Sequence, residues 1–274
     1  MFSFRFGKET QYVCIQFART GQRPHRAKTA LALAALSLFG LTAANPAAAQ
    51  TTTVYSNNFT NGAGPGWSTT ATDTTPGTAS HVADKFLGQF GNQTTTLTLN
   101  GLASHSTVNV AFDLYMIRTM DGNGPEGPDS WSLAENAHTL IFTNFATATL
   151  LNQTQDFGGS NGSGGYLTGG HYAPYTGATE INTLGFLSRG QVEDAVFHLS
   201  FTFADASSAL NLNFIGGQTQ GIDDESWGLD NVIVKTNAAP VPEAGTSTSL
   251  GLLLALGLGG LAIARRRKAS ASAK

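Results

Sequence analysis

The 274-residue sequence has a single cysteine, few charged side chains, and no stretch with the periodicity of an amphipathic helix. The cysteine, Cys14, lies near the start of the chain, in a segment that we predict is removed from the mature protein. A mature chain without a thiol excludes disulfide bonds, a thiolate nucleophile and thiolate metal sites. The folded domain must then be stabilised by its core or by hard cations.

Basic residues are scarce in the central part of the chain, residues 51–239. Sixteen acidic residues stand there against four basic ones, a formal net charge of −12 that the whole-chain value of −3 conceals. The four are Lys85, Arg118, Arg189 and Lys235. Such a charge excludes nucleic acid as a partner, because nothing would neutralise the phosphates. It is compatible with binding of calcium or neutral sugars.

Residues 1–49 have the features of a secretory signal peptide. A basic region is followed by an uncharged run at 29–44, and Ala47, Ala48 and Ala49 supply a small-residue cleavage site. We predict cleavage between Ala49 and Gln50. An amphipathic transit peptide is the alternative, but the apolar run has the compactness of a signal core.

The tail contains a second uncharged run, residues 246–264. As a helix rising about 1.5 Å per residue it would reach roughly 28 Å, close to the thickness of a bilayer core. Arg265, Arg266 and Arg267 follow at once, and the positive-inside rule places them on the cytoplasmic side with the remaining tail, residues 269–274. On these features alone, an ordinary tail anchor is the simpler interpretation.

The residues just before this run change that interpretation. Val241, Pro242 and Glu243, then small and polar residues, the apolar segment and the arginine cluster together resemble the PEP-CTERM sorting signal, here residues 240–268. Ala244 stands where that family usually has a second proline. The resemblance implies a Gram-negative bacterium in which an exosortase recognises the tail, cuts near Pro242 and releases an inner-membrane intermediate to the cell surface.

The central residues 51–239 predict an all-β domain. Apolar and polar residues alternate over several segments, a period of two that is typical of antiparallel strands with one face on a core. We expect about ten strands in a two-sheet antiparallel sandwich like a jelly roll. The clearest segments are 96–100, 108–117, 197–203 and 210–214, and weaker ones are 54–59, 86–90, 131–135, 139–145, 149–154 and 228–235.

A glycine-rich stretch at 156–170 lacks this alternation and predicts a long exposed loop. Tyr166, Tyr172 and Tyr175 lie in or beside it. Because exposed aromatic rings offer both apolar area and a polar edge, we interpret these tyrosines as candidates for stacking on sugars. Trp131 and Trp227, at predicted strand starts, are expected in the core.

An acidic loop at 121–131 is a candidate cation site. Asp121, Asn123, Glu126 and Asp129 place four oxygen-bearing side chains within nine residues, and a hard cation such as Ca²⁺ prefers oxygen ligands. The loop is not an EF-hand, because Pro125 occupies the third ligand position. The alternative is a connection rich in turn formers whose Asp and Asn side chains bond to their own backbone.

A second acidic cluster, residues 223–232, contains Asp223 and Asp230. Its W-G-L-D-N-V ending, together with the opening Tyr55-Ser56-Asn57-Asn58-Phe59, is similar to jelly-roll domains of the concanavalin-like and MAM type. In many of these the first and last strands pair and an aspartate of the last strand holds a structural cation. The resemblance implies Asp230 as a ligand; the alternative is that Asp230 faces solvent or caps a bulge.

No catalytic constellation is predicted. The G-x-S-x-G at 158–162 lies in a polar glycine loop, and the G-x-G-x-x-G at 122–127 is interrupted by Pro125 and has no helix after it. The histidines show no metal-ligand spacing. We therefore expect a non-enzymatic, surface-sorted structural or adhesive protein of the extracellular polysaccharide (biofilm) matrix. The alternative is a calcium-stabilised, lectin-like carbohydrate-binding module.

Overall fold

The computed structural model describes residues 50–147 and 153–238, which carry the predicted central domain. This part of the chain is built from β-strands and turns and contains no helix, so none that could cross a membrane. The predicted signal peptide at 1–49, the sorting signal and the apolar segment at 246–264 lie outside the described residues. The all-β class predicted from the sequence is confirmed.

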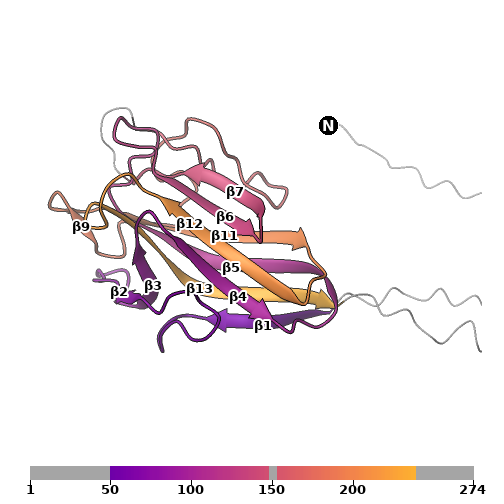
Figure 1. The fold of residues 1–274 in the computed structure, drawn as a ribbon. Helices are drawn as coiled ribbons and strands as arrows, with labels where there is room; N and C mark the ends of the chain where they lie inside the picture. The colour runs from indigo at the N-terminus through magenta and orange to yellow at the C-terminus, as the bar shows by residue number, and fades with distance from the viewer. Residues whose placement is uncertain (1–49, 148–152, 239–274) are drawn as a thin grey trace, which may run out of the picture. The chain divides into compact units, whose positions relative to one another are not determined.

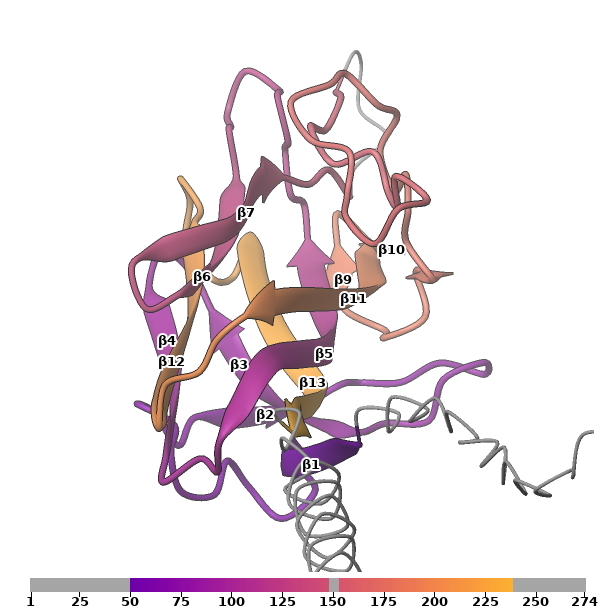
Figure 2. The same cartoon turned by 90° about the vertical axis from the view of Figure 1, so that its right-hand side faces the viewer.

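One sheet has seven strands, and the last strand of the domain lies at its centre (Figures 1 and 2). The order is β2-β3-β13-β5-β11-β8, with β1 pairing to β13 beside β3. Every pairing within it is antiparallel. The strands are β1 (Thr51–Asn57), β2 (Thr72–Thr74), β3 (Lys85–Phe90), β5 (His105–Arg118), β8 (Glu180–Ile181), β11 (Asp194–Ala204) and β13 (Glu225–Ala238).

The other sheet has four antiparallel strands in the order β4-β12-β6-β7. They are β4 (Thr94–Asn100), β6 (Ser130–Glu135), β7 (His138–Asn144) and β12 (Ala209–Gly217). A short hairpin, β9 (Leu187–Ser188) with β10 (Gln191–Val192), stands apart from both sheets.

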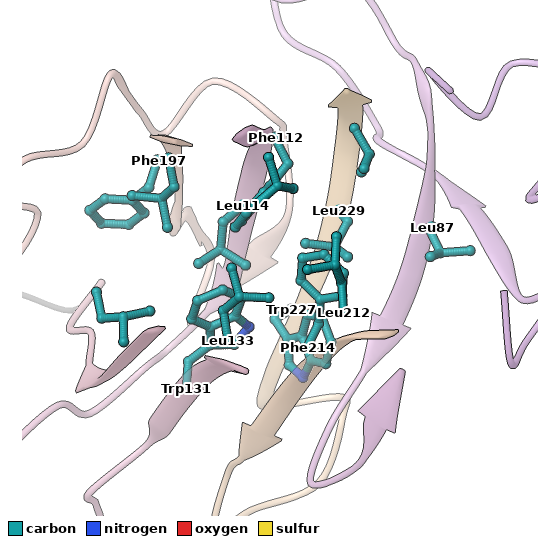
Figure 3. Close-up of a cluster of buried hydrophobic side chains, with 14 of the residues drawn as sticks. Leu87, Phe112, Leu114, Trp131, Leu133, Phe197, Leu212, Phe214, Trp227 and Leu229 are labelled. Atoms are coloured by element: carbon teal, nitrogen blue, oxygen red, sulfur yellow. The ribbon is translucent and has the colours of Figure 1, made fainter. Parts of the chain in front are cut away.

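The core lies between the two sheets (Figure 3). Phe112 of β5 meets Phe214 of β12 edge to face, with ring centroids 5.2 Å apart. Trp131 of β6 meets Trp227 of β13 in the same way, at 6.3 Å. Both tryptophans are fully buried, as the sequence predicts. Aromatic pairs of this geometry add stability beyond the area they bury.

The strongly alternating segments all form strands, and so do five of the six weaker ones. For the sixth, 149–154, residues 149–152 lie outside the described part, and Gln153 and Thr154 belong to no strand. The short strands β2, β8, β9 and β10 were not predicted, because two or three residues carry no readable period.

The alternation in β13 changes phase at Asn231. Trp227 and Leu229 fill the core before it and Val232 and Val234 after it. The register of β13 against β5 shifts between Asp230 and Ile233, and Asn231 has a φ of 50°. An extra residue in left-handed conformation is the usual device of a β-bulge. Asp230 faces away from the core because it alternates with Leu229, and the bulge at Asn231 returns Val232 to the core.

Candidate functional site

Three buried carboxylates converge at one end of the sandwich. Asp121 follows the end of β5, Asp129 immediately precedes β6, and Glu225 is the first residue of β13. One carboxylate oxygen from each lies within 4.8 Å of the other two. Asp129 and Glu225 are 0% exposed and Asp121 is 6% exposed. We call these three residues the acidic triad.

The loop between β5 and β6 folds back on itself to bring two members of the triad together. The backbone N–H of Asp121 donates to Oδ2 of Asp129 at 2.5 Å. The fold-back needs glycine at two positions, because a Cβ on Gly127 would lie 2.3 Å from the carbonyl oxygen of Gly122, and Gly122 itself has a φ of 55°. The predicted acidic loop is therefore a compact turn with its carboxylates facing inward.

Glu225 reaches the same place from the start of β13, in the seven-stranded sheet. Its Oε2 accepts from the backbone N–H of Gln220 at 3.3 Å, whereas Oε1 is buried without a hydrogen-bond partner. Asp129 accepts at Oδ1 from the backbone N–H of Thr219, also at 3.3 Å. The triad thus has a few backbone donors and no basic side chain among the ion pairs of the described residues.

Burial dominates the electrostatics of the triad. It raises the pKa of Asp129, and it raises that of Asp121 together with the neighbouring charge of Asp129. Burial, followed by the effect of the Asp129 carboxyl, raises the pKa of Glu225 to about 9. Without a cation the triad would keep at least one proton at neutral pH, because crowded buried carboxylates cannot all ionise.

Gln153 is a fourth polar side chain at this place. It is 7% exposed, and its amide nitrogen donates to Oδ1 of Asp121. Its amide oxygen, Oε1, is buried and has no partner. The segment from which it comes follows β7, so the side chains around the triad come from three different parts of the chain.

The other predicted ligands lie elsewhere. Asn123 is exposed and is hydrogen-bonded to Asp156 and Asn144. Asp223 is exposed and outside the triad. Asp230 is 1% exposed, but it points to the opposite face of β13 from Glu225, since successive side chains of a strand alternate. Five residues of strand separate the two by about 17 Å.

Asp230 has a hydrogen-bonded environment of its own. The Tyr115 hydroxyl donates to Oδ2 at 3.0 Å, and the backbone N–H of Asn231 donates to Oδ1 at 2.7 Å. Burial is the main cause that raises the pKa of Asp230 to about 6. The aspartate that the resemblance implies as a ligand is therefore separate from the triad. As the resemblance also implies, the first and last strands pair, from Thr51 with Asn237 to Asn57 with Val232.

The three predicted sugar-binding tyrosines are half-buried, which differs from the exposure expected of a glycine-rich loop. Tyr166 packs on Phe157 and Phe201, and its hydroxyl accepts from the backbone N–H of Ser200 at 2.7 Å. The Tyr175 hydroxyl donates to the carbonyl of Thr147. These rings attach the loop to the domain, a role that composition alone does not reveal.

A shallow groove of about 370 Å³ lies between β7 and this loop. Tyr166 forms part of its wall, and Phe142 of β7 lines it with a side chain that is 65% exposed. The exposed aromatic residue beside the loop is thus Phe142, which sequence reasoning missed because it sits inside a strand pattern. Glu225 was also missed as a ligand. The sequence holds one signal for it: Glu225 stands two positions before the core residue Trp227, just as Asp129 stands two positions before the core residue Trp131.

No protein family of known profile matches the chain, and no curated protein matches it either. Three solved structures show a distant likeness. A family GH115 4-O-methyl-alpha-glucuronidase with specificity for decorated arabinogalactans is 10% identical, with a TM-score of 0.31 over 67% of this chain. The Agl-KA catalytic domain is 10% identical, with a TM-score of 0.29 over 73% of this chain. A GH87 alpha-1,3-glucanase catalytic domain is 12% identical, with a TM-score of 0.22 over 68% of this chain.

This chain spans only 17%, 30% and 30% of the lengths of those three proteins. At these identities and TM-scores the likeness assigns neither a family nor an activity.

Proposed function

We propose that this chain is an exported, surface-sorted protein that acts as a structural or adhesive component of an extracellular polysaccharide matrix. The observation that carries the proposal is the order Val241-Pro242-Glu243, apolar segment 246–264 and arginine cluster. An acidic β-sandwich without cysteine suits an extracellular location, where a domain must rely on its core and on cations for stability.

The protein in this proposal is not an enzyme. Glycoside hydrolysis needs two carboxyl groups on either side of a bound sugar. The three carboxylates of the acidic triad are closed off from solvent. A raised pKa such as that of Glu225 can mark a catalytic acid, but a group that is 0% exposed has no access to a sugar.

The intact mass of the cell-surface form tests the sorting proposal. We expect the mature form to begin near Gln50 and to end near Pro242. A variant with Pro242→Ala and Glu243→Ala should keep its tail and stay in the inner membrane. The matched control, Glu126→Ala in an exposed loop, should be processed as the natural chain is. A surface form that still carries Lys274 would contradict the proposal.

A carbohydrate-binding module is the second candidate, and the groove beside Phe142 favours it. An exposed ring on a rigid strand next to polar Thr139 and Thr202 offers a stacking face and hydrogen-bonding groups. A glycan array with the full chain is the test. Binding that Phe142→Ala removes and Val82→Ala retains would support this candidate, since Val82 is 86% exposed and does not line the groove. Absence of binding to every glycan on the array would favour the structural role.

A further inference from the structure

We propose that the acidic triad is a structural calcium site, with Asp121, Asp129 and Glu225 as ligands and the amide oxygen of Gln153 as a fourth. The inference does not depend on the proposed matrix function, because it rests on the geometry of described residues alone. It also places the ion away from Asp230, the position that the jelly-roll resemblance implies.

The spacing of the triad suits one ion. Calcium binds oxygen at 2.3–2.6 Å, so two ligands of the same ion lie at most about 5 Å apart. The three carboxylate oxygens, all within 4.8 Å of one another, meet this limit without any movement of the backbone. They approach from the loop between β5 and β6 and from the start of β13, so an ion between them would join two parts of the chain.

The triad needs either a cation or a retained proton to offset its charge. A buried carboxylate elsewhere in the chain, Asp194, shows the alternative solution, because it accepts from the backbone N–H groups of Leu184, Gly185 and Phe186 at 3.0–3.1 Å. Glu225, by contrast, has one buried oxygen without any donor. A buried charge is costly in free energy unless it is paired with an opposite charge or coordinates a metal.

Gln153 gives a second observation that points to a ligand. It carries no charge, so its position is independent of the clustering of acids, yet its amide reaches Asp121 and leaves a buried oxygen unpaired. The oxygen and nitrogen of an amide are assigned from the hydrogen-bond network. Rotated by half a turn, the amide would present its oxygen to a cation at the triad.

The ligand set favours calcium over other cations. Three carboxylates and an amide oxygen are hard ligands, and the described residues around them supply neither imidazole nor thiolate. Magnesium demands near-ideal octahedral geometry at 2.0–2.1 Å and usually keeps several waters with one or two carboxylates. A buried site with three carboxylates suits the more flexible shell of calcium.

Such an ion would fix one end of the sandwich. It would join the loop between β5 and β6, the segment after β7 and the start of β13. A ligand that binds only the folded state stabilises it by mass action.

Calcium titration of the full chain, purified in mild detergent and first stripped with chelator, is the test. We expect the melting temperature to rise by roughly 5–10 °C when free Ca²⁺ is about 100 times its Kd, with a smaller rise for Mg²⁺. Glu225→Gln, which keeps the shape of the side chain, should abolish most of the rise. The matched control Asp223→Asn, exposed and two residues away, should keep it.

A second measurement covers the case in which Glu225→Gln does not fold. Terbium bound at the triad should luminesce on tryptophan excitation, and Ca²⁺ should displace it at one site per chain. Three results would overturn the proposal: no thermal shift in the natural chain, an equal shift with Mg²⁺, or loss of the shift in Asp223→Asn. Absence of competable terbium luminescence would overturn it as well.

Discussion

Trp131 and Trp227 meet edge to face across the two sheets, with ring centroids 6.3 Å apart and ring planes at 79° (Figure 3). Each follows a member of the acidic triad by two positions, Trp131 after Asp129 and Trp227 after Glu225. Side chains two apart along a strand share a face. The packing of the tryptophans therefore brings the two carboxylates together at the end of the same interface.

Replacement of Trp227 should test how much this contact stabilises the domain. Trp227→Ala removes the packing on Phe90 and Trp131 and the hydrogen bond from Nε1 to the carbonyl of Gly91. We expect the free energy of unfolding in urea to fall by about 3–5 kcal/mol. Phe142→Ala, an exposed aromatic control, should change it by less than about 0.5 kcal/mol. Equal losses would contradict the assignment of Trp227 to the core.

Gly228 should not tolerate a side chain. A Cβ at this position would lie 2.4 Å from ring atoms of Phe86, on the face of β13 opposite the core. We expect Gly228→Ala to destabilise the domain by about 1–3 kcal/mol through overpacking, measured by urea denaturation. The control is Gly221→Ala, where nothing lies within 4 Å. A harmless Gly228→Ala would show that Phe86 does not pack there.

The buried Asp230 should make stability depend on pH. Its pKa is raised to about 6 in the fold, above the unfolded value of about 3.9, so the native state holds its proton longer than the unfolded state. Stability from this group is complete below about pH 4 and is lost as pH rises through 6, on the order of 3 kcal/mol in all. The groups facing it are Tyr115, Asp113 and Asp84.

Asp230→Asn isolates this effect. The free energy of unfolding of the variant, minus that of the natural chain, should increase between pH 4 and pH 7 when both are measured in chelator by urea denaturation. Acids that do not interact with Asp230 are common to both chains and cancel in the difference. A difference that is flat with pH would show that Asp230 titrates normally.

The same variant distinguishes the two acidic sites. If calcium binds at the triad, Asp230→Asn should leave the calcium-dependent rise in melting temperature unchanged, because Asp230 lies on the opposite face of β13. Differential scanning calorimetry with and without Ca²⁺ measures this. Loss of the rise in this variant would place the ion at Asp230 instead.

Much of the fold can be predicted from the sequence because a half-buried antiparallel strand alternates apolar and polar residues with a period of two. The alternation of Val108, Val110, Phe112 and Leu114 predicts β5 and its core face, and all four are buried. A strand of two residues such as β8 is too short to show this alternation, so it cannot be predicted from the pattern. The bulge at Asn231 was predicted only as an alternative for Asp230, since a bulge leaves only one extra residue as its trace.

The candidate site was predictable in part. Asp121 and Asp129 are close in sequence, so a loop can bring them together, whereas Glu225 and Gln153 reach the triad only through the pairing of strands far apart in the chain. The W-G-L-D-N-V pattern indicates Asp230 as a ligand, but Asp230 alternates with the core residue Leu229 and so lies on the face of β13 away from Glu225. Composition likewise predicted exposed tyrosines beside the glycine loop, and packing on Phe157 and Phe201 half-buries Tyr166 instead.

Anomalous diffraction from crystals of the protein grown with Ca²⁺ tests the calcium site most directly. A single peak should lie between Asp121, Asp129 and Glu225, with carboxylate oxygens at 2.3–2.6 Å and the oxygen of Gln153 turned toward it. An empty triad, or a peak beside Asp230, would contradict the site.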